Sequence, residues 1–364
     1  MIKTKVLCLF PRFYIGGVSK ALSFVANTCD EAGMEVHCVS MTSEPETIQL
    51  NQGIVRYRID TERRDSAINY FIHKVFFILK FRKLADHIKP DVIVAFRPDL
   101  AKAAQYATSG MNIPIIGSER GNPLLYGKKL RLFNKVFNRC AAVVFQTEAA
   151  RDVYNITTKS VIIPNPAVTR NNGDKEKHIR TGQNIVTVSR LSSEKNIEGL
   201  LHAFALIKEK ISGRKLILYG DGPQQDELEK LASDLHIEND VMFVGNVKDF
   251  TTQNDDASIF VLNTLSEGMP NALIEAMLSG YTCICTDCPV GAPRWLSDDG
   301  RRVKLVPLKD DIKLSQAILE VINNQDLAKS LAYNALEVGD LLNPKKISEL
   351  WLNLIKEVVD ENRK

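Results

Sequence analysis

Short runs of β-branched and apolar residues alternate with longer segments of helical periodicity from one end of the chain to the other. The runs that predict strands are Lys5–Phe10, Glu35–Ser40, Val92–Phe96, Ile113–Gly117, Ala142–Phe145, Val161–Ile163, Asn184–Ser189, Lys215–Tyr219, Val241–Val244, Ile259–Leu262, Thr282–Thr286 and Lys304–Val306. Strands that alternate with helices are typical of βα units and parallel sheets. Because ligands of such sheets bind at the carboxyl ends of the strands, chemistry is expected in the loops that directly follow them.

The length of 364 residues and a polar stretch between the two series of strands predict two domains. We expect an N-terminal domain at 1–168, a linker at 169–182, a C-terminal domain at 183–340, and a helix within 341–364 that packs back on the first domain. The predicted fold class is α/β, with two doubly wound Rossmann-like domains facing a cleft.

Charge is distributed unevenly between the two halves. Residues 1–165 hold 23 Lys and Arg against 14 Asp and Glu, whereas the remainder holds 24 against 30. The basic half is therefore where acidic partners are expected. The seven cysteines are scattered, and no leader or membrane-spanning run is evident, which predicts a cytoplasmic protein.

The segment SEGMPNALIEAM, residues 266–277, reads as a turn followed by a helix that starts near Pro270. A helix start binds anions through its free amides and its dipole. Glu267 and Glu275 flank this start, roughly 12 Å apart along a helix, whereas a glycosidase pair requires about 5 to 9.5 Å. An elongated ligand with hydroxyls at both ends and phosphates in the middle suits two such acids, and a nucleotide sugar has this layout. The alternative is a solvated helix residue and a turn residue.

Two other strand-end loops carry residues suited to phosphates. Arg190 and Lys195 follow the strand that ends near Ser189 and would bring two fixed cations to a diphosphate; alone, they would be ordinary surface residues. Gly16 and Gly17 follow the first strand, where glycines allow close approach of a phosphate or sugar, or simply form a turn. The turn Tyr219–Pro223 is interpreted as structural.

Taken in order, the segments Arg190–Lys195, Tyr219–Pro223, Phe243–Val247 and Glu267–Glu275 resemble retaining GT-B glycosyltransferases of family 4, over nearly the whole chain. The resemblance implies that Glu275 holds the ribose hydroxyls of the donor and Glu267 the transferred sugar. It implies that Arg190 and Lys195 bind the diphosphate with no metal. The other residues it places at the donor are Gly268, Met269, Pro270 and Asn271 by their backbone, and Asn246 and Val247 beside the base.

One loop departs from the family. Where many members carry a histidine, this chain has Glu119 and Arg120, which we count as candidate catalytic residues. A guanidinium stays protonated and cannot act as a base, so deprotonation of the acceptor would fall to the donor phosphate. Cys283, Cys285 and Cys288 offer three thiols without a nearby histidine, and no Asp-x-Asp sequence occurs, so we predict no metal site and no cofactor.

The function predicted from the resemblance is transfer of a hexose or N-acetylhexosamine from a nucleoside-diphosphate sugar, with UDP as the nucleotide. The acceptor would be a glycan, free or linked to a polyprenyl diphosphate, in bacterial surface polysaccharide synthesis. The alternatives are a nucleotide-sugar epimerase of the same fold and a non-catalytic donor-binding subunit. A periplasmic sugar-binding protein would need an export signal.

Two basic segments interleaved with aromatics, residues 68–83 and 124–139, predict peripheral association with an anionic membrane at the inner face of the cell membrane. The alternative is that their apolar faces pack on the first sheet and the cations are merely solvated. No nucleic-acid reader motif accompanies these cations, so nucleic acid is not expected as a partner.

Overall fold

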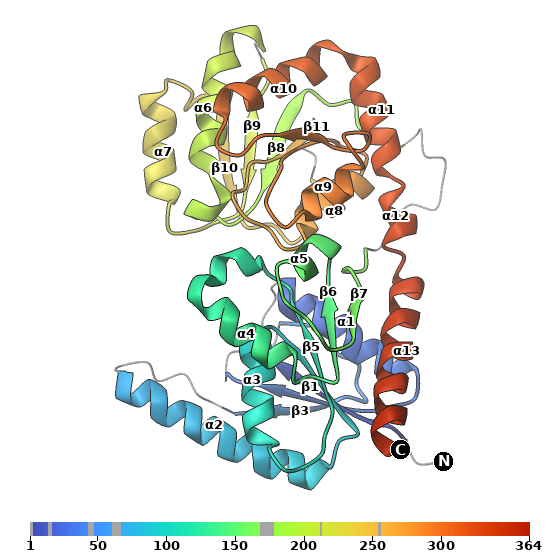
Figure 1. The fold of residues 1–364 in the computed structure, drawn as a ribbon. Coiled ribbons are helices and arrows are strands. Elements are labelled where there is room, and N and C mark those ends of the chain that lie inside the picture. The colour runs from blue at the N-terminus through green and yellow to red at the C-terminus, as the bar shows by residue number, and fades with distance from the viewer. Residues whose placement is uncertain are drawn as a thin grey trace. The chain divides into compact units, whose positions relative to one another are not determined.

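The structure is a computed structural model that describes residues 3–13, 17–42, 47–59, 67–167, 178–211, 213–253 and 256–364. The chain divides into two compact units, one formed by Met1–Pro166 with Pro344–Lys364 and the other by Ala167–Asn343. Most of the expected linker lies outside the described residues. Figure 1 shows the elements of each unit.

The first unit is built on a seven-stranded parallel sheet of order β3-β2-β1-β4-β5-β6-β7. Its strands are β1 (Lys5–Phe10), β2 (Glu35–Ser40), β3 (Val55–Arg58), β4 (Val92–Phe96), β5 (Ile115–Ser118), β6 (Ala142–Phe145) and β7 (Ser160–Ile162). Its helices are α1 (Gly17–Glu31), α2 (Ala67–Ile88), α3 (Pro98–Ala107), the 3-10 helix η1 (Pro123–Lys129), α4 (Leu130–Phe137), α5 (Glu148–Asp152) and α13 (Pro344–Arg363).

Helices cover both faces of this sheet. The helix α13 returns to the first unit and packs beside α1, where Trp351 and Leu354 join a core with Leu22 and Val25. In a second layer, the helix α3 contacts both α2 and α4 (Figure 1). Burial on both faces explains why the central strand β4 is uniformly apolar in sequence.

The second unit holds a six-stranded parallel sheet of order β10-β9-β8-β11-β12-β13. Its strands are β8 (Asn184–Val188), β9 (Leu216–Tyr219), β10 (Val241–Gly245), β11 (Ala257–Leu262), β12 (Thr282–Thr286) and β13 (Lys304–Val306). Its helices are α6 (Ile197–Ile207), α7 (Gln225–Asp234), α8 (Asn271–Leu278), α9 (Ala292–Ser297), α10 (Asp311–Asn323), α11 (Gln325–Ala335) and α12 (Val338–Leu341), with 3-10 helices η3 (Ser193–Lys195), η4 (Lys208–Lys210) and η5 (Phe250–Thr252).

Each sheet has one point at which the chain changes direction across the strand order. In the second unit the chain moves outward from β8 to β10, and then restarts beside β8 with β11. In the first unit the corresponding neighbours are β1 and β4. Ligands of doubly wound sheets bind at the carboxyl ends of the strands at such a switch point.

The predicted fold class, two doubly wound parallel α/β domains, is confirmed. Differences are local. The edge strand β3 was not predicted, because its four residues are exposed or half-buried and carry no apolar run. β5 starts at Ile115, two residues later than expected. Pro270 was expected at the first helical position but is the N-cap of α8, with φ −78° and ψ 91°.

Candidate functional site

The first part of the site is the loop after β8. Arg190 is exposed and, within the described part of the chain, its guanidinium makes no hydrogen bond or ion pair. Two hydrogen bonds hold this loop against residues 221–224. Leu191 N–H donates to the Asp221 carbonyl (2.8 Å), and Gln224 N–H donates to the Leu191 carbonyl (3.2 Å). The predicted structural role of the Tyr219–Pro223 turn is therefore support of the loop that carries Arg190.

The second part of the site is the segment between β11 and α8. Glu267 lies in the turn, with 14% of its side chain exposed, and its Oε1 accepts a hydrogen bond of 2.6 Å from Lys195 Nζ. Glu275 is half-buried in the second turn of α8. The N-cap Pro270 provides no side-chain hydrogen bond to the start of α8, so the amide groups of the first turn are not capped from within that residue.

Hydrogen bonds join these two loops. The Glu194 carbonyl accepts from Leu265 N–H (2.8 Å) and from the Thr264 hydroxyl (3.0 Å). The Asn263 side-chain amide donates to the Asn196 carbonyl (3.0 Å). Lys195 therefore lies between two residues whose backbones are tied to the segment that precedes Glu267, and the ion pair is built into the fold.

Charges and burial act together around this pair. Burial opposes ionisation of Glu194, but its own backbone N–H and the nearby charges of Lys195 and Arg190 hold the pKa of its carboxyl below the ordinary value. On the neighbouring β12 loop, burial raises the pKa of Cys288 to about 11. Cys288 is thus a neutral thiol beside the pair, and its Sγ lies 3.2 Å from the Thr264 carbonyl oxygen.

The predicted base-side residues lie at the end of β10. Asn246 is exposed and donates a side-chain hydrogen bond to the Asp221 carboxylate, and Val247 is half-buried. Gly220 N–H donates to the Gly245 carbonyl (2.8 Å), which ties this end of β10 to the turn after β9. That the base of the donor nucleotide lies beside Asn246 and Val247 stays a prediction.

In the first unit, Glu119 is 1% exposed and lies just beyond β5. Its Oε1 accepts from the N–H groups of Arg120 and Gly121 (both 2.9 Å) and from the Tyr126 hydroxyl (3.0 Å), and its Oε2 accepts from the Tyr154 hydroxyl. Burial raises the pKa of Glu119. With these four donors and no access to solvent, Glu119 orders its loop, and any catalytic role would act through that loop.

Arg120 is buried as well, at 8% exposure. Its guanidinium carbon lies 4.3 Å from the centre of the Phe96 ring and 5.6 Å from that of Trp351 on α13. Nη1 donates to the Asn165 side-chain oxygen (3.1 Å), while Nε and Nη2 have no partner among the described residues. Burial lowers the pKa of Arg120 to about 9. Arg120 therefore links α13 to the ends of β4 and β5.

Sequence reasoning missed Arg97, the residue directly after β4 at the switch point of the first sheet. It adopts φ 90° and ψ 143°, a conformation rare for residues with a side chain. Its half-exposed fork pairs with Asp99 through bonds of 3.0 and 2.8 Å. No sequence pattern indicates backbone strain, so Arg97 becomes a candidate for the functional site only through the structure. Of the predicted glycines, Gly17 begins α1, and Gly16 lies outside the described residues.

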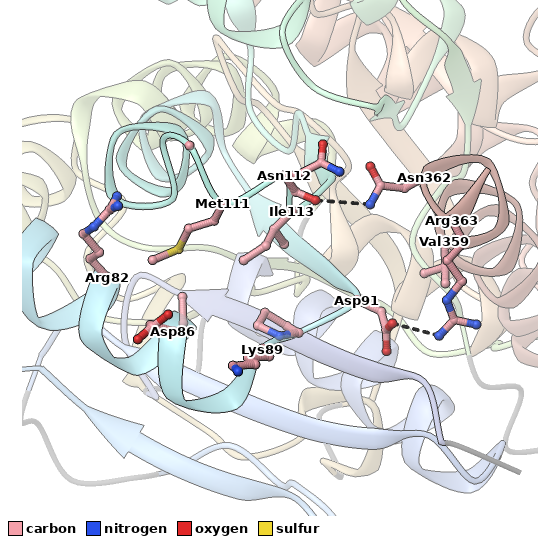
Figure 2. Close-up of a pocket in the computed structure, with 13 residues that line it drawn as sticks. Arg82, Asp86, Lys89, Asp91, Met111, Asn112, Ile113, Val359, Asn362 and Arg363 are labelled. Atoms are coloured by element: carbon pink, nitrogen blue, oxygen red, sulfur yellow. Dashed lines mark hydrogen bonds and ion pairs between the residues drawn. The ribbon is translucent and has the colours of Figure 1, made fainter.

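Figure 2 shows a separate hollow of about 530 Å³ in the first unit, at the amino ends of β4 and β5. Arg363 pairs with Asp91 (2.8 Å) and Asn362 donates to the Asn112 carbonyl (3.2 Å), so the last turn of α13 closes one side of it. None of the predicted site residues lines it. Some of the charged residues at its rim are thus already paired with one another. The hollow lies at the end of the sheet opposite to the loops that follow the strands.

The described residues offer neither a metal site nor a membrane span. They contain no group of three or more His, Cys, Asp or Glu side chains placed to hold a metal ion. Nor does any helix built from them combine the length and the apolar character needed to cross a bilayer.

Comparison with known proteins identifies the class. The family model described as glycosyl transferases group 1 matches residues 169–338, and the model described as glycosyltransferase family 4 matches residues 15–170. Two parallel α/β units are also the fold of the GT-B glycosyltransferases. The chain belongs to family 4 of these enzymes, and its activity is glycosyl transfer.

Two curated relatives are named as transferases of N-acetylhexosamines. The GalNAc-alpha-(1->4)-GalNAc-alpha-(1->3)-diNAcBac-PP-undecaprenol alpha-1,4-N-acetyl-D-galactosaminyltransferase of Campylobacter jejuni is 26% identical, over 93% of this chain and 98% of its own. The poly(ribitol-phosphate) alpha-N-acetylglucosaminyltransferase of Staphylococcus aureus is 27% identical, over 60% of this chain and 44% of its own.

Solved structures share the fold at low identity. Sucrose-phosphate synthase of Thermosynechococcus elongatus superimposes with a TM-score of 0.84 at 16% identity, covering 99% of this chain and 100% of that one. Anabaena HepE in complex with UDP-glucose gives a TM-score of 0.79 at 17% identity, covering 97% and 99%.

Gly220 packs closely against the loop that carries Arg190, so we expect a side chain at this position to disturb that loop. Gly220 has φ 128°, and a Cβ there would lie 1.9 Å from the Ser189 carbonyl oxygen. Gly220→Ala should destabilise the second unit by more than the roughly 1–2 kcal/mol of backbone strain alone, because the loop must also move. Thermal unfolding measures the loss.

The matched control is Gly213→Ala, where φ is also positive at 82° but no atom lies within 4 Å of the added Cβ. It isolates the strain from the clash. Equal losses of stability in the two variants would show that the turn does not support the loop.

Proposed function

We propose that this enzyme transfers a hexose or N-acetylhexosamine from a nucleoside-diphosphate sugar, with UDP as the nucleotide and with retention of anomeric configuration. The acceptor is a glycan, free or polyprenyl-diphosphate-linked, of bacterial surface polysaccharide synthesis. The observation that carries the proposal is the set of two cations and two acids at the switch point of the second sheet, with Arg190 exposed and Lys195 paired with Glu267.

Each member of this set has a part in the proposed reaction. Negative charge on the diphosphate grows as the sugar–phosphate bond breaks, so the fixed cations Arg190 and Lys195 stabilise the transition state more than the bound donor. The amides at the start of α8 add to this stabilisation. Glu267 and Glu275 accept hydrogen bonds from sugar and ribose hydroxyls, and the fixed cations would do the work of a divalent metal.

The comparisons support this choice of substrates. The solved HepE structures contain UDP or UDP-glucose, and a solved TarM structure from Staphylococcus aureus contains UDP. The Campylobacter relative is named for an acceptor on undecaprenol diphosphate, and a Bacillus subtilis relative for a poly(glycerol-phosphate) acceptor. Several of these relatives are named as α-transferases of N-acetylhexosamine or glucose.

The proposal is tested by turnover. Purified enzyme is offered a panel of nucleotide sugars with extracts of lipid-linked glycans as acceptor, and nucleoside diphosphate release is measured with and without EDTA. We expect release with one UDP-sugar, unaffected by EDTA, and an α-linked product by NMR. Conversion of the donor without acceptor would favour the epimerase, binding without turnover would favour a non-catalytic subunit, and rescue by magnesium or manganese after EDTA would contradict the metal-free account.

Glu275→Ala should weaken donor binding, because the ribose loses an ionised hydrogen-bond partner. The expected cost is about 1.5–3 kcal/mol, roughly ten- to 150-fold in dissociation constant by calorimetric titration. Glu349→Ala, on the exposed side of α13, is the control and should bind the donor normally. An unchanged constant for Glu275→Ala would remove this residue from the site.

We also propose that the first unit binds an anionic membrane surface. Large apolar side chains remain exposed on four neighbouring elements, α2, α3, η1 and α4, and cations flank them. On α2, Phe76 is 43% and Leu79 55% exposed, and Lys80 Nζ lies 4.2 Å from the centre of the Phe76 ring. On η1, Leu124 and Leu125 are 51% and 72% exposed.

The remaining members of this surface are Val75, Tyr106 and Leu132, with the cations Lys83, Lys102, Lys128, Lys129, Arg131 and Lys135. Apolar side chains that insert at the headgroup level, ringed by cations worth about 1 kcal/mol each, are what an anionic bilayer binds. A lipid-linked acceptor would then reach the enzyme from that surface.

The double variant Leu124→Ser, Leu125→Ser should reduce binding to vesicles that contain phosphatidylglycerol, because both side chains would leave the lipid. Flotation of protein with vesicles measures this, and binding of the unaltered protein should weaken at high salt. Leu206→Ser, an equally exposed leucine of the second unit at 57%, should float normally. Binding that ignores lipid charge, or no binding of the unaltered protein, would contradict the membrane proposal.

A further inference from the structure

The two cations proposed for the diphosphate are in different states. Arg190 is exposed and has no hydrogen-bond or ion-pair partner within the described residues, whereas Lys195 Nζ already donates to Glu267 Oε1 at 2.6 Å. Only 20% of the Lys195 side chain and 14% of the Glu267 side chain are exposed. An ion pair of this length, shielded from water on most sides, is stronger than the same pair at an open surface.

The pair is held in place by the backbone. Hydrogen bonds from Leu265 and Thr264 to the Glu194 carbonyl fix the segments that carry Lys195 and Glu267 at short range. Among the described residues, Glu267 is the only hydrogen-bond partner of Lys195 Nζ, although the Glu194 carboxylate also lies close enough to sense Lys195. Lys195 and Glu267 are therefore expected to pair whenever no ligand binds either side chain.

We propose that Glu267 and the leaving diphosphate compete for Lys195, so that re-formation of the Lys195–Glu267 pair drives release of the nucleoside diphosphate. This inference rests on the proposed function. With the nucleotide sugar bound, Lys195 turns to the diphosphate and Glu267 accepts hydrogen bonds from the sugar. After transfer the sugar leaves with the acceptor, and Glu267 is a nearly buried carboxylate with no hydroxyl partner.

A carboxylate shielded from water regains stability by pairing again with the adjacent ammonium group. This withdraws one of the two cations from the nucleoside diphosphate and leaves only Arg190 and the start of α8 to hold it. The exchange transfers no proton and makes or breaks no covalent bond, because Lys195 and Glu267 only change their hydrogen-bond partners. The exchange favours the donor over the product, because only the donor offers Glu267 hydroxyls in return for Lys195.

The test is the affinity of UDP for the full chain, measured by calorimetric titration. Glu267→Gln keeps the size of the side chain but frees Lys195, so UDP should bind roughly three- to tenfold more tightly. Uridine, which lacks phosphates, should bind as before. In a Lys195→Ala background, Glu267→Gln should have no effect on UDP, which is the coupling that a double-mutant cycle isolates.

Glu194→Gln is the matched control. It also removes one carboxylate near Lys195 and Arg190, but one that does not hydrogen-bond Lys195 Nζ, so UDP affinity should change by less than about twofold. An effect as large as that of Glu267→Gln would show that only the local field matters. Unchanged or weaker UDP binding by Glu267→Gln, with the melting temperature preserved, would overturn the inference.

The two proposals fail in different ways. If the unaltered protein binds no nucleoside diphosphate of a panel with UDP, GDP, ADP, CDP and TDP, the proposed function and this inference both fall. If it binds one of them and Glu275→Ala weakens the donor, but Glu267→Gln does not tighten that diphosphate, the proposed function stands and only the competition for Lys195 is wrong.

Discussion

The carbonyl oxygen of Glu194 accepts two hydrogen bonds, from Leu265 N–H and from the Thr264 hydroxyl, and the site of the second unit depends on them. They join the loop after β8 to the loop after β11, which are adjacent only because the chain restarts beside β8 at the switch point. The 2.6 Å contact between Lys195 and Glu267 follows from that junction. The topology of the sheet thus brings Lys195 and Glu267, 72 positions apart in the sequence, together as an ion pair.

Sequence alone predicted the parts of this arrangement that depend on local pattern. Strands such as Val92–Phe96 and Thr282–Thr286 were predicted at their observed bounds, because a strand buried on both faces must be apolar along its length. The edge strand β3 escaped, since an edge tolerates polar residues and gives no such run. The position of Pro270 differed by one residue, which lies within the usual uncertainty of helix ends.

Long-range contacts lay beyond the sequence. The strand-end rule placed Arg190, Lys195 and Glu267 in loops of one sheet and Glu275 on the helix that follows, but the pairing of Lys195 with Glu267 depends on which strands are neighbours. The state of Glu119 was equally hidden, because its burial depends on Tyr154, 35 residues away, whose hydroxyl donates to its carboxylate. A carboxylate that follows a strand looks the same in sequence whether it faces a ligand or the core.

The helix α2 packs part of its basic, aromatic segment on the first unit and leaves another part exposed. Phe77 and Phe81 are buried, as packing on the unit requires, while Phe76 and Leu79 on the same helix are exposed. The apolar side chains of this helix lie on more than one of its sides, so the first unit buries only some of them. Exposed apolar surface of this kind is typical of a site that binds a membrane or a partner protein. The excess of cations in residues 1–165 is the reason that we propose an anionic bilayer for this surface. In residues 166–364, where acids outnumber cations, the proposed competition for Lys195 would withdraw one of the two cations that we assign to the diphosphate.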